Sequence, residues 1–420
     1  MFNDFSPLDV FIRLKEEEIT FLQFFNRVNQ YTVFLKKFNF SKSSRIMLLC
    51  DSSLEQLYLF FSCLNLGLVP VLIHSKTPQA LIKDYFFDLD ASYIFTSAPE
   101  LTDDTKVSSS LNLNPYLNFI LLTSGSSGKA KFVLLNLNNM IASAKVVSKV
   151  LKFNKSNIWF NCLPLHHVGG LSIIFRCLVT GASMYLDKFS LVSFSNLSYS
   201  HISIVKSMAY ELFKNEITPP VSLKVFLCGG SPFSNDEINF FKNKKYPIFL
   251  SYGCTEFGSQ VACSFLNSSK NIFLNFLDHV HYKINNRNEL LIKGDALFLG
   301  YWHKKTGSYV LELDNDDFFN TKDIVFIEQN KIIDIKSPEN RSISGGENLN
   351  LNQIKAVLYK FNGVKNVHIS TIDHLKYGKR PIAYLDMDEP FPGDEKLRSY
   401  CKKHLPPYAC PDFFLPFSSL

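Results

Sequence analysis

Hydroxyl, glycine and lysine residues are concentrated in one short stretch, Thr123-Ser124-Gly125-Ser126-Ser127-Gly128-Lys129-Ala130-Lys131. Its hydroxyl and backbone N–H groups can donate hydrogen bonds to a phosphate, and its lysines add positive charge. The stretch lies between two apolar segments, 119–123 and 132–135, which we predict to be strands. It therefore lacks the GxxxxGK[ST] spacing and the following helix of a Walker A loop. We interpret it as a phosphate-binding hairpin loop, with a flexible surface loop as the alternative.

Histidines are the other candidates for chemistry that the residue types alone suggest. His279 and His281 alternate along a predicted strand without acidic or cysteine companions at ligand spacing, so we expect no zinc there. His166 and His167 lie side by side in the segment LPLHHVGG. A lone histidine is most often a satisfied core residue, and we expect a structural role for His166.

Alternating helical and strand-like segments must position these residues. Segments 45–50 and 69–74 are short apolar strands, and 54–66 between them has helical spacing, which is typical of a parallel β–α–β unit. Further strands are predicted at 93–96, 119–123, 158–163, 183–186, 202–205, 224–228 and 248–252. The pattern predicts a large doubly wound α/β region.

The pattern changes after about residue 265. Hydrophobic and polar residues alternate at 279–284, 289–293, 323–328 and 331–335, which predicts a mostly antiparallel β subdomain. Segment 336–340 is polar and contains proline, as suits a hinge. Helices at 351–361 and 394–404 and strands at 367–371 and 382–386 follow. We therefore expect an N-terminal domain over 1–335, a hinge over 336–340 and a small α+β domain over 341–420.

The composition excludes several classes of protein. Lys+Arg 44 against Asp+Glu 38 gives a net charge of +6, too small an excess to indicate a nucleic-acid-binding protein. The apolar segment 57–73 contains Gly67 and Pro70 and is shorter than the roughly 20 residues of a membrane span, so we predict a buried helix, a turn and a strand. Nine cysteines without a CxxC pair, and an N-terminus without an apolar signal segment, indicate a reduced, cytoplasmic protein.

The anion loop and the motifs after it resemble those of the adenylate-forming superfamily, which includes acyl-CoA ligases, adenylation domains and luciferases. The motifs are the loop at 123–131, LPLHHVGG at 163–170, GGSP at 229–232, YGCTE at 252–256, TKD at 321–323 and SGGEN at 344–348. Within the superfamily, segments 162–186, 203–208 and 377–385 are most similar to o-succinylbenzoate–CoA ligases of menaquinone or phylloquinone synthesis. The resemblance implies a large multi-layer N-terminal domain with parallel-rich sheets and a β subdomain, followed by a small α+β domain.

The resemblance implies a reaction with ATP, Mg²⁺ and CoA, in which a carboxylic acid becomes an acyl-adenylate and then a thioester. Thr255 would donate to the α-phosphate, Glu256 would bind Mg²⁺, and Tyr252 would stack on adenine. Asp323 would accept hydrogen bonds from the ribose. The full set implied for nucleotide binding is Thr123, Ser124, Gly125, Ser126, Ser127, Gly128, Lys131, Gly229, Gly230, Tyr252, Gly253, Thr255 and Asp323. The catalytic residues would be Thr255, Glu256, His167 and Lys131.

The resemblance implies fewer residues for binding the acid and CoA than for binding the nucleotide. His167 would be a gate residue beside the acyl pocket, next to Gly170. Arg176 or Lys206 would meet the second carboxylate or the ketone of o-succinylbenzoate. The residues implied at the hinge and the CoA side are Glu339, Ser344, Gly345 and Gly346.

The chain departs from the family pattern in three places. Lys322 stands where the family has the glycine of TGD, and Lys336-Ser337 stands where it has Gly-Arg, so that Lys336 or Arg341 would have to replace the ribose-facing arginine. The family's catalytic lysine lies beyond the equivalent of 414–420, where the sequence as given stops. We expect either a truncated sequence or an impaired first half-reaction.

Two other functions stay open at this point. One is a ligase for another aryl or fatty acid, or an adenylation domain that loads a carrier protein. The other is a degenerate paralogue that binds nucleotide without full turnover. In each case the expected partners are small molecules, with no nucleic acid and no membrane span, and a homo-oligomer is an open alternative.

Overall fold

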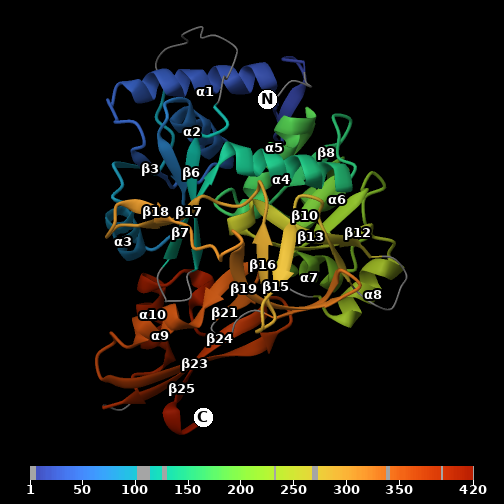
Figure 1. Cartoon of the computed structure of the whole chain (residues 1–420). Helices are drawn as coiled ribbons and strands as arrows, with labels where there is room; N and C mark the ends of the chain where they lie inside the picture. Colours follow the sequence, from blue (N-terminus) through green and yellow to red (C-terminus); the bar gives the residue numbers. More distant parts are fainter. Residues whose placement is uncertain are drawn as a thin grey trace.

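The computed structural model describes residues 6–101, 114–124, 130–230, 233–266, 273–336, 341–388 and 391–419. In this part of the chain, three β-sheets are covered by helices (Figure 1). The α/β class expected from the sequence is therefore confirmed. The anion loop residues Gly125, Ser126, Ser127, Gly128 and Lys129, and the hinge residues 337–340, lie outside the described residues.

The smaller sheet of the N-terminal part has seven strands in the order β18-β17-β7-β6-β4-β3-β5. Their bounds are β3 Arg45–Leu48, β4 Val69–Leu72, β5 Tyr93–Phe95, β6 Asn118–Ser124, β7 Ala130–Asn136, β17 Gly300–His303 and β18 Ser308–Val310. β3 and β4 are parallel, and helix α2 (Ser53–Asn65) connects them. The apolar segment 57–73 is thus a buried helix, a turn at Gly67 with φ +70° and a buried strand, as predicted.

The larger sheet has thirteen strands in the order β15-β16-β19-β20-β14-β13-β12-β11-β10-β8-β9-β1-β2. The bounds from the parallel side are β1 Val10–Arg13, β2 Glu18–Thr20, β8 Ile158–Asn161, β9 Ser183–Leu186, β10 His201–Ile204, β11 Val225–Cys228 and β12 Ile248–Cys254. The antiparallel side comprises β13 Ser259–Phe265, β14 Leu274–Phe276, β15 His281–Ile284, β16 Glu289–Lys293, β19 Phe319–Glu328 and β20 Lys331–Lys336. The change from parallel to antiparallel pairing occurs at the β12–β13 turn, one strand earlier than the residue 265 expected from the sequence, because β13 already pairs antiparallel with β12.

Helices α4 and α5 pack on each other next to both sheets (Figure 1). One hydrophobic cluster includes side chains from both sheets and from helices α1, α2, α4 and α5. The N-terminal part contains the helices α1 Phe21–Lys36, α3 Gln79–Leu89, α4 Leu137–Val150, α5 Val168–Thr180, α6 Leu191–Asn196, α7 Lys206–Lys214, α8 Asn235–Asn243 and the short 3-10 helix η1 Thr255–Phe257. Because the core is shared, the two sheets are held in a fixed relation at the site between them.

The C-terminal part forms a sheet and a core of its own, below the N-terminal part in Figure 1. Its elements are β21 Arg341–Ser344, β22 Glu347–Asn350, α9 Leu351–Leu358, β23 Val364–His374, β24 Gly378–Met387, α10 Asp394–His404, η2 Pro407–Ala409, β25 Phe413–Pro416 and η3 Phe417–Ser419. Its core joins α9 and α10 to the sheet through residues such as Ile354, Val367 and Leu397. An ion pair between Lys376 and Glu211 of α7 is one of its contacts with the N-terminal part.

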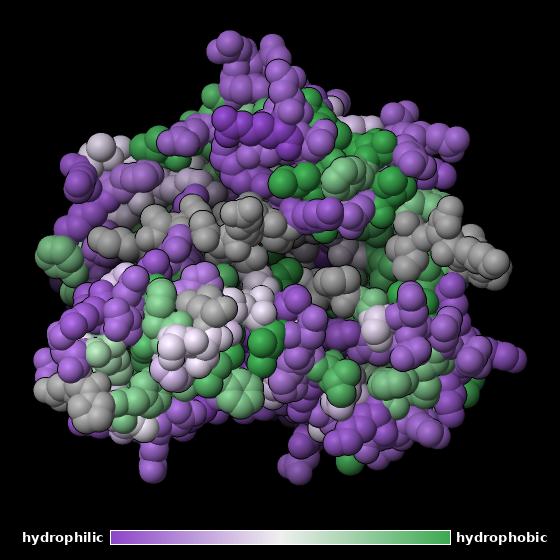
Figure 2. Space-filling model, turned by 90° about the horizontal axis from the view of Figure 1, so that it is seen from below, coloured by the Kyte–Doolittle hydropathy of each residue, from purple (hydrophilic) through white to green (hydrophobic). Residues whose placement is uncertain are grey.

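The face seen in Figure 2, from below, mixes hydrophilic residues with small groups of hydrophobic ones. In the described ranges, none of the helices combines the length and the apolar character that crossing a membrane requires.

His279 is a histidine for which the surroundings provide no hydrogen bond. The strand predicted from residue 279 begins only at His281, because the preceding residues form a turn closed by Val280 N–H donating to the Leu277 carbonyl (2.9 Å). Both ring nitrogens of His279 are buried and have no partner among the described residues, and its ring lies 5.3 Å from that of Phe257. Burial, opposed by Asp278 and Asp295, lowers the pKa of His279 to about 4.

We predict that His279 makes the fold sensitive to acid. Below its ordinary pKa of 6.5 the unfolded chain binds a proton at His279 that the folded chain binds only near pH 4, so stability falls as the pH drops through this window. His279→Leu should reduce that loss by about 1 kcal/mol at pH 5, measured by urea unfolding at pH 7 and pH 5. The matched control is His281→Leu, an exposed histidine on the neighbouring strand. Equal pH dependence in the His279 variant and the unsubstituted protein would refute the prediction.

Candidate active site

The predicted phosphate-binding segment, 123–131, connects two paired strands, as expected. Thr123 pairs with Lys131 and Ser124 with Ala130 in the antiparallel β6–β7 hairpin, so a strand and not a helix follows the loop. The loop residues 125–129 themselves lie outside the described residues.

Lys131 at the base of this hairpin and Glu256 both contact Tyr301. The Lys131 ammonium is 4.4 Å from the centre of the Tyr301 ring, and the Tyr301 hydroxyl donates to Glu256 Oε1 (2.7 Å). Tyr301 reaches this position because β17 pairs with β7. Sequence reasoning missed Tyr301; its signal would have been the Gly300-Tyr301 pair at the start of a strand. A lysine, a phenol and a carboxylate from three elements thus meet at one end of the hairpin.

A close contact between backbones fixes the position of the YGCTE segment. A Cβ atom at Gly253 would lie 1.8 Å from the Ser259 carbonyl oxygen, so only glycine fits where β12 turns into β13. The turn continues as η1, which ends at Gly258 with φ +60°. Phe257 is fully buried, and the Glu256 carbonyl accepts from Phe298 N–H (2.8 Å). The side chains of Thr255 and Glu256 are therefore carried on a short, anchored turn.

Tyr252 and Asp323 are directly bonded. The Tyr252 hydroxyl donates to Asp323 Oδ2 (2.7 Å). Burial and then the negative charge of Asp323 raise the pKa of Tyr252 well above its usual range, so the phenol stays a donor. Thr321 Oγ1 accepts from Asp323 N–H (3.1 Å) and donates to the Leu290 carbonyl (2.8 Å), which fixes the TKD segment on β19. The two residues predicted at the adenine and the ribose therefore lie at one place.

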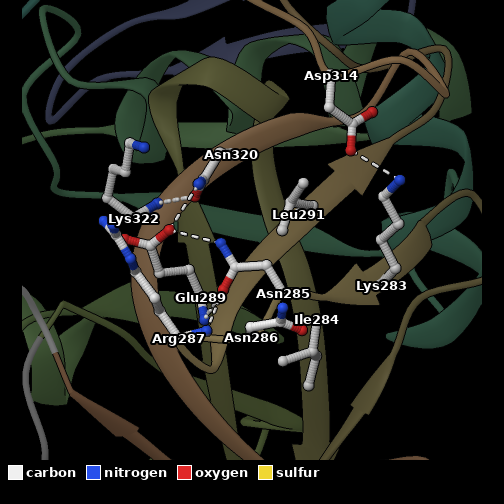
Figure 3. A pocket seen from close by; sticks show the side chains of 10 residues that line it. All are labelled: Lys283, Ile284, Asn285, Asn286, Arg287, Glu289, Leu291, Asp314, Asn320 and Lys322. Atoms are coloured by element: carbon white, nitrogen blue, oxygen red, sulfur yellow. Dashed lines mark hydrogen bonds and ion pairs between the residues drawn. The ribbon is translucent and has the colours of Figure 1, made fainter.

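Lys322 occupies a backbone conformation that favours glycine. Its φ is +67°, in the left-handed region, at the position where the family pattern has glycine. Lys322 lies at the edge of a polar cleft of ≈ 550 Å³ between the β15–β16 hairpin and β19 (Figure 3). In that cleft, Asn285 and Asn320 donate to Glu289, and these hydrogen bonds lower the pKa of Glu289.

The glycines at 229–230 and 345–346 lie against each other. Gly230 has φ +88°, and a Cβ there would lie 3.5 Å from Gly346 Cα. A Cβ at Gly346, with φ +96°, would lie 2.7 Å from Val205 Cγ1. Gly345 N–H donates to the Tyr377 carbonyl (2.7 Å), and Ser344 is buried. Because these glycines have no side chains, the backbone of the C-terminal part can approach the backbone that follows β11.

His167 joins the same boundary between the two parts. Its Nε2 lies 2.8 Å from Glu347 Oε1, although 180 positions separate the two residues. Burial disfavours the charged imidazole, but the charge and the hydrogen bond of Glu347 outweigh it and raise the pKa of His167. His167 precedes α5, whose start packs tightly: a Cβ at Gly170 would lie 2.3 Å from the Pro164 carbonyl oxygen. The sequence did not single out Glu347 as a partner, because nothing in a linear chain indicates this contact.

Arg176 is a buried cation without a counter-ion in the part of the chain described. Its side chain is on α5 and is 1% exposed. Its guanidinium lies over the Trp159 ring and reaches Ser259 Oγ and Gln260 Oε1 only at 3.4 Å. Burial lowers the pKa of Arg176 to about 10, so it remains charged at pH 7. A buried charge of this kind is costly unless an anion binds to it.

Lys206 differs from Arg176 in this respect. Its ammonium forms a buried ion pair with Glu237 and lies 5.5 Å from the centre of the Phe233 ring. Glu237 is also the third residue of α8, where it completes a capping box with Ser234. The sequence analysis named Arg176 and Lys206 as candidates to bind the acid. Among the described residues, Lys206 has an ionic partner and Arg176 has none. Glu339 lies outside the described residues.

Comparison with known sequences identifies relatives over nearly the whole chain. A family model described as "AMP-binding enzyme" matches residues 6–118 and 116–302. The 2-succinylbenzoate–CoA ligase of Haemophilus influenzae is 26% identical over 394 residues, which cover 92% of this chain and 86% of that protein. The protein of the same name from Staphylococcus epidermidis strain RP62A is 31% identical over 320 residues, 72% of this chain and 66% of that protein.

Comparison with solved structures shows the same fold. A double mutant of Bacillus subtilis o-succinylbenzoate CoA synthetase, bound to a product analogue, has a TM-score of 0.86 at 22% identity, covering 98% of this chain and 92% of that one. The same enzyme with ATP and magnesium has a TM-score of 0.71 at 22% identity and 98% and 93% coverage. An adenylation–carrier didomain protein from Klebsiella oxytoca has a TM-score of 0.81 at 18% identity and 98% and 91% coverage. The family model matches well over half of the length of this chain. The chain therefore belongs to the AMP-binding enzyme family.

Proposed function

We propose that this chain is an acid–CoA ligase that converts o-succinylbenzoate to o-succinylbenzoyl-CoA, a step of menaquinone or phylloquinone synthesis. The carboxylate first attacks the α-phosphate of ATP, which forms the acyl-adenylate and releases pyrophosphate, and the CoA thiol then displaces AMP to form the thioester. Several relatives that match most of the chain carry the name 2-succinylbenzoate–CoA ligase. The observation that carries the choice of acid is the buried guanidinium of Arg176.

The first step joins two anions, a carboxylate and the α-phosphate of ATP, so the site must offset negative charge. Lys131 and the hairpin loop supply cationic and N–H groups from one side. Glu256 fits a role as Mg²⁺ ligand, because its carboxylate is a hard oxygen donor. The Tyr301 hydroxyl donates a hydrogen bond to one oxygen of this carboxylate and so orients it. Mg²⁺ would neutralise phosphate charge when it is bound with ATP.

The nucleoside would be held by groups that the fold has already oriented. Tyr252 and Asp323 are locked together by their hydrogen bond, so an aromatic face and a carboxylate acceptor are both in place before the nucleotide binds. Thr255 follows on the same anchored turn and would donate its hydroxyl to the α-phosphate. Preorganised groups of this kind stabilise the transition state without the cost of reorientation.

Arg176 supports an acid that carries a second carboxylate. A monocarboxylic fatty acid or a plain aryl acid offers one carboxylate, and the reaction consumes its charge. o-Succinylbenzoate keeps another carboxylate, whose charge would compensate the guanidinium that the protein leaves buried without an ionic partner. His167 and Gly170, at the start of the helix that carries Arg176, would border the same acid.

The second step would take place with the two parts arranged as described. We propose that 1–335 and 341–420 act as two domains around a hinge at 336–340. The closer fit to the complex with a CoA product analogue than to the complex with ATP, at equal identity and coverage of this chain, supports a thioester-forming arrangement. In it, Ser344, Gly345, Gly346 and Glu347 lie against the N-terminal domain, where CoA would enter.

The site of action that we propose is a reducing compartment such as the cytoplasm. All nine cysteines are free, and eight of them are buried. For example, burial raises the pKa of Cys50 to about 12, so its reactive thiolate form is rare at neutral pH.

The proposed function is tested with a panel of acids in an assay that detects pyrophosphate release and thioester formation separately. We expect o-succinylbenzoate to be preferred over benzoate and over fatty acids of similar size. Equal activity with a monocarboxylic aryl acid would favour the broader ligase reading. Binding of ATP without either product would favour a nucleotide-binding protein.

We predict that Glu256→Gln lowers metal-dependent turnover without changing the fold. An amide oxygen is a weaker Mg²⁺ ligand than a carboxylate, so the loss should be about 10²-fold or more at limiting Mg²⁺ and smaller at high Mg²⁺. Turnover is measured across a Mg²⁺ titration, with the thermal midpoint as the check on folding. Tyr301→Phe, which removes only the hydroxyl that orients Glu256, should have a smaller effect. An unchanged Mg²⁺ dependence in Glu256→Gln would exclude this role.

We predict that Arg176→Met has opposite effects on stability and on acid binding. Removing an unpaired buried charge should leave the free protein as stable as before or more stable, while KM for o-succinylbenzoate rises and KM for ATP stays unchanged. The matched control is Lys206→Met, which strands buried Glu237 and should destabilise the fold by about 3–5 kcal/mol. Both are measured by urea unfolding and by steady-state kinetics. Destabilisation of the Arg176 variant with an unchanged KM for the acid would show that Arg176 is structural.

A further inference from the structure

Three side chains able to bind a metal ion meet at the boundary between the two parts of the chain. His166 and His167 come from the segment before α5, and Glu347 is the first residue of β22. One ligand atom from each of the three lies within 4.8 Å of the others. In a tetrahedral zinc site the ligand atoms are about 3.4 Å apart, so small side-chain rotations would bring them to an ion.

The three side chains are of types that zinc binds. Imidazole nitrogens and carboxylate oxygens are both common zinc ligands in proteins.

The ring of His166 is half-buried and makes no hydrogen bond to another of the described residues. It packs against the rings of His167 and His74, with ring centres 4.2 Å and 4.8 Å away. The His74 ring is itself oriented, because its Nδ1 accepts from Lys76 N–H (2.9 Å). No protein group among the described residues therefore competes with an ion for the ring nitrogens of His166.

We propose that His166, His167 and Glu347 bind a divalent transition metal of the zinc type across this boundary. The two histidines belong to the N-terminal part and the glutamate to the C-terminal part, so the ion would hold the parts in the arrangement described. A water molecule would complete the coordination, as in other three-ligand zinc sites. The site does not include Glu256, but it shares His167 and Glu347 with the proposed acid and CoA sides; metal binding itself is measured without substrates and does not depend on the proposed function.

The proposal is tested by titrating the metal-free, fully reduced protein with Co²⁺, followed by its d–d absorption, and with Zn²⁺ by calorimetry. We expect saturable binding of one ion. Glu347→Gln and His166→Ala should each weaken it by more than the roughly 10–100-fold that loss of an outer hydrogen-bond partner costs. His281→Ala, at an exposed histidine elsewhere, should bind like the unsubstituted protein. Thermal unfolding without metal checks that the variants fold, and Glu347→Gln preserves the shape of the side chain.

A second readout addresses the bridge between the two parts. Zn²⁺ should raise the thermal midpoint of the unsubstituted protein and leave that of Glu347→Gln almost unchanged, because binding only to the folded, closed arrangement stabilises it. Binding retained by both variants, or an intense thiolate-to-cobalt band that assigns the ion to cysteines, would overturn the proposal. So would the absence of saturable binding.

Discussion

The contact between the backbones of Gly253 and Ser259 is the constraint on which the candidate active site depends. It brings β12 and β13 together so closely that no side chain fits, and the chain must turn through η1 within a few residues. Tyr252 is thereby placed on the side of Asp323, and Glu256 on the side of Tyr301 and Lys131. One turn thus connects the larger sheet, which carries Asp323, with the smaller sheet, which carries Lys131.

The two buried cations, Lys206 and Arg176, differ in whether another protein charge compensates them. Lys206 and Glu237 neutralise each other and support the start of α8, so their charges are used within the fold. Arg176 is as deeply buried but has only weak polar contacts at 3.4 Å among the described residues. Because an isolated buried charge opposes folding, this difference is the basis of the role proposed for Arg176.

The boundary between the two parts includes close approaches of glycine backbone and specific polar pairs. Gly230 and Gly346 allow close approach, and His167–Glu347 and Lys376–Glu211 connect the parts at two further points. Each part has its own hydrophobic core, so the contact between them can change without unfolding either.

The sequence by itself determined the β–α–β pattern of the N-terminal part, the hairpin at 123–131, an antiparallel region after about residue 265 and the family, because periodicity and short motifs are local properties. Helix α10, for instance, has the predicted bounds, 394–404. Only the tertiary structure decided that Tyr301 orients Glu256, that Glu347 meets His167 across 180 positions, and that Lys206 is paired whereas Arg176 is not. These contacts join segments far apart in the chain, and the pairing of a charge depends on which side chains folding brings beside it, which no local pattern contains.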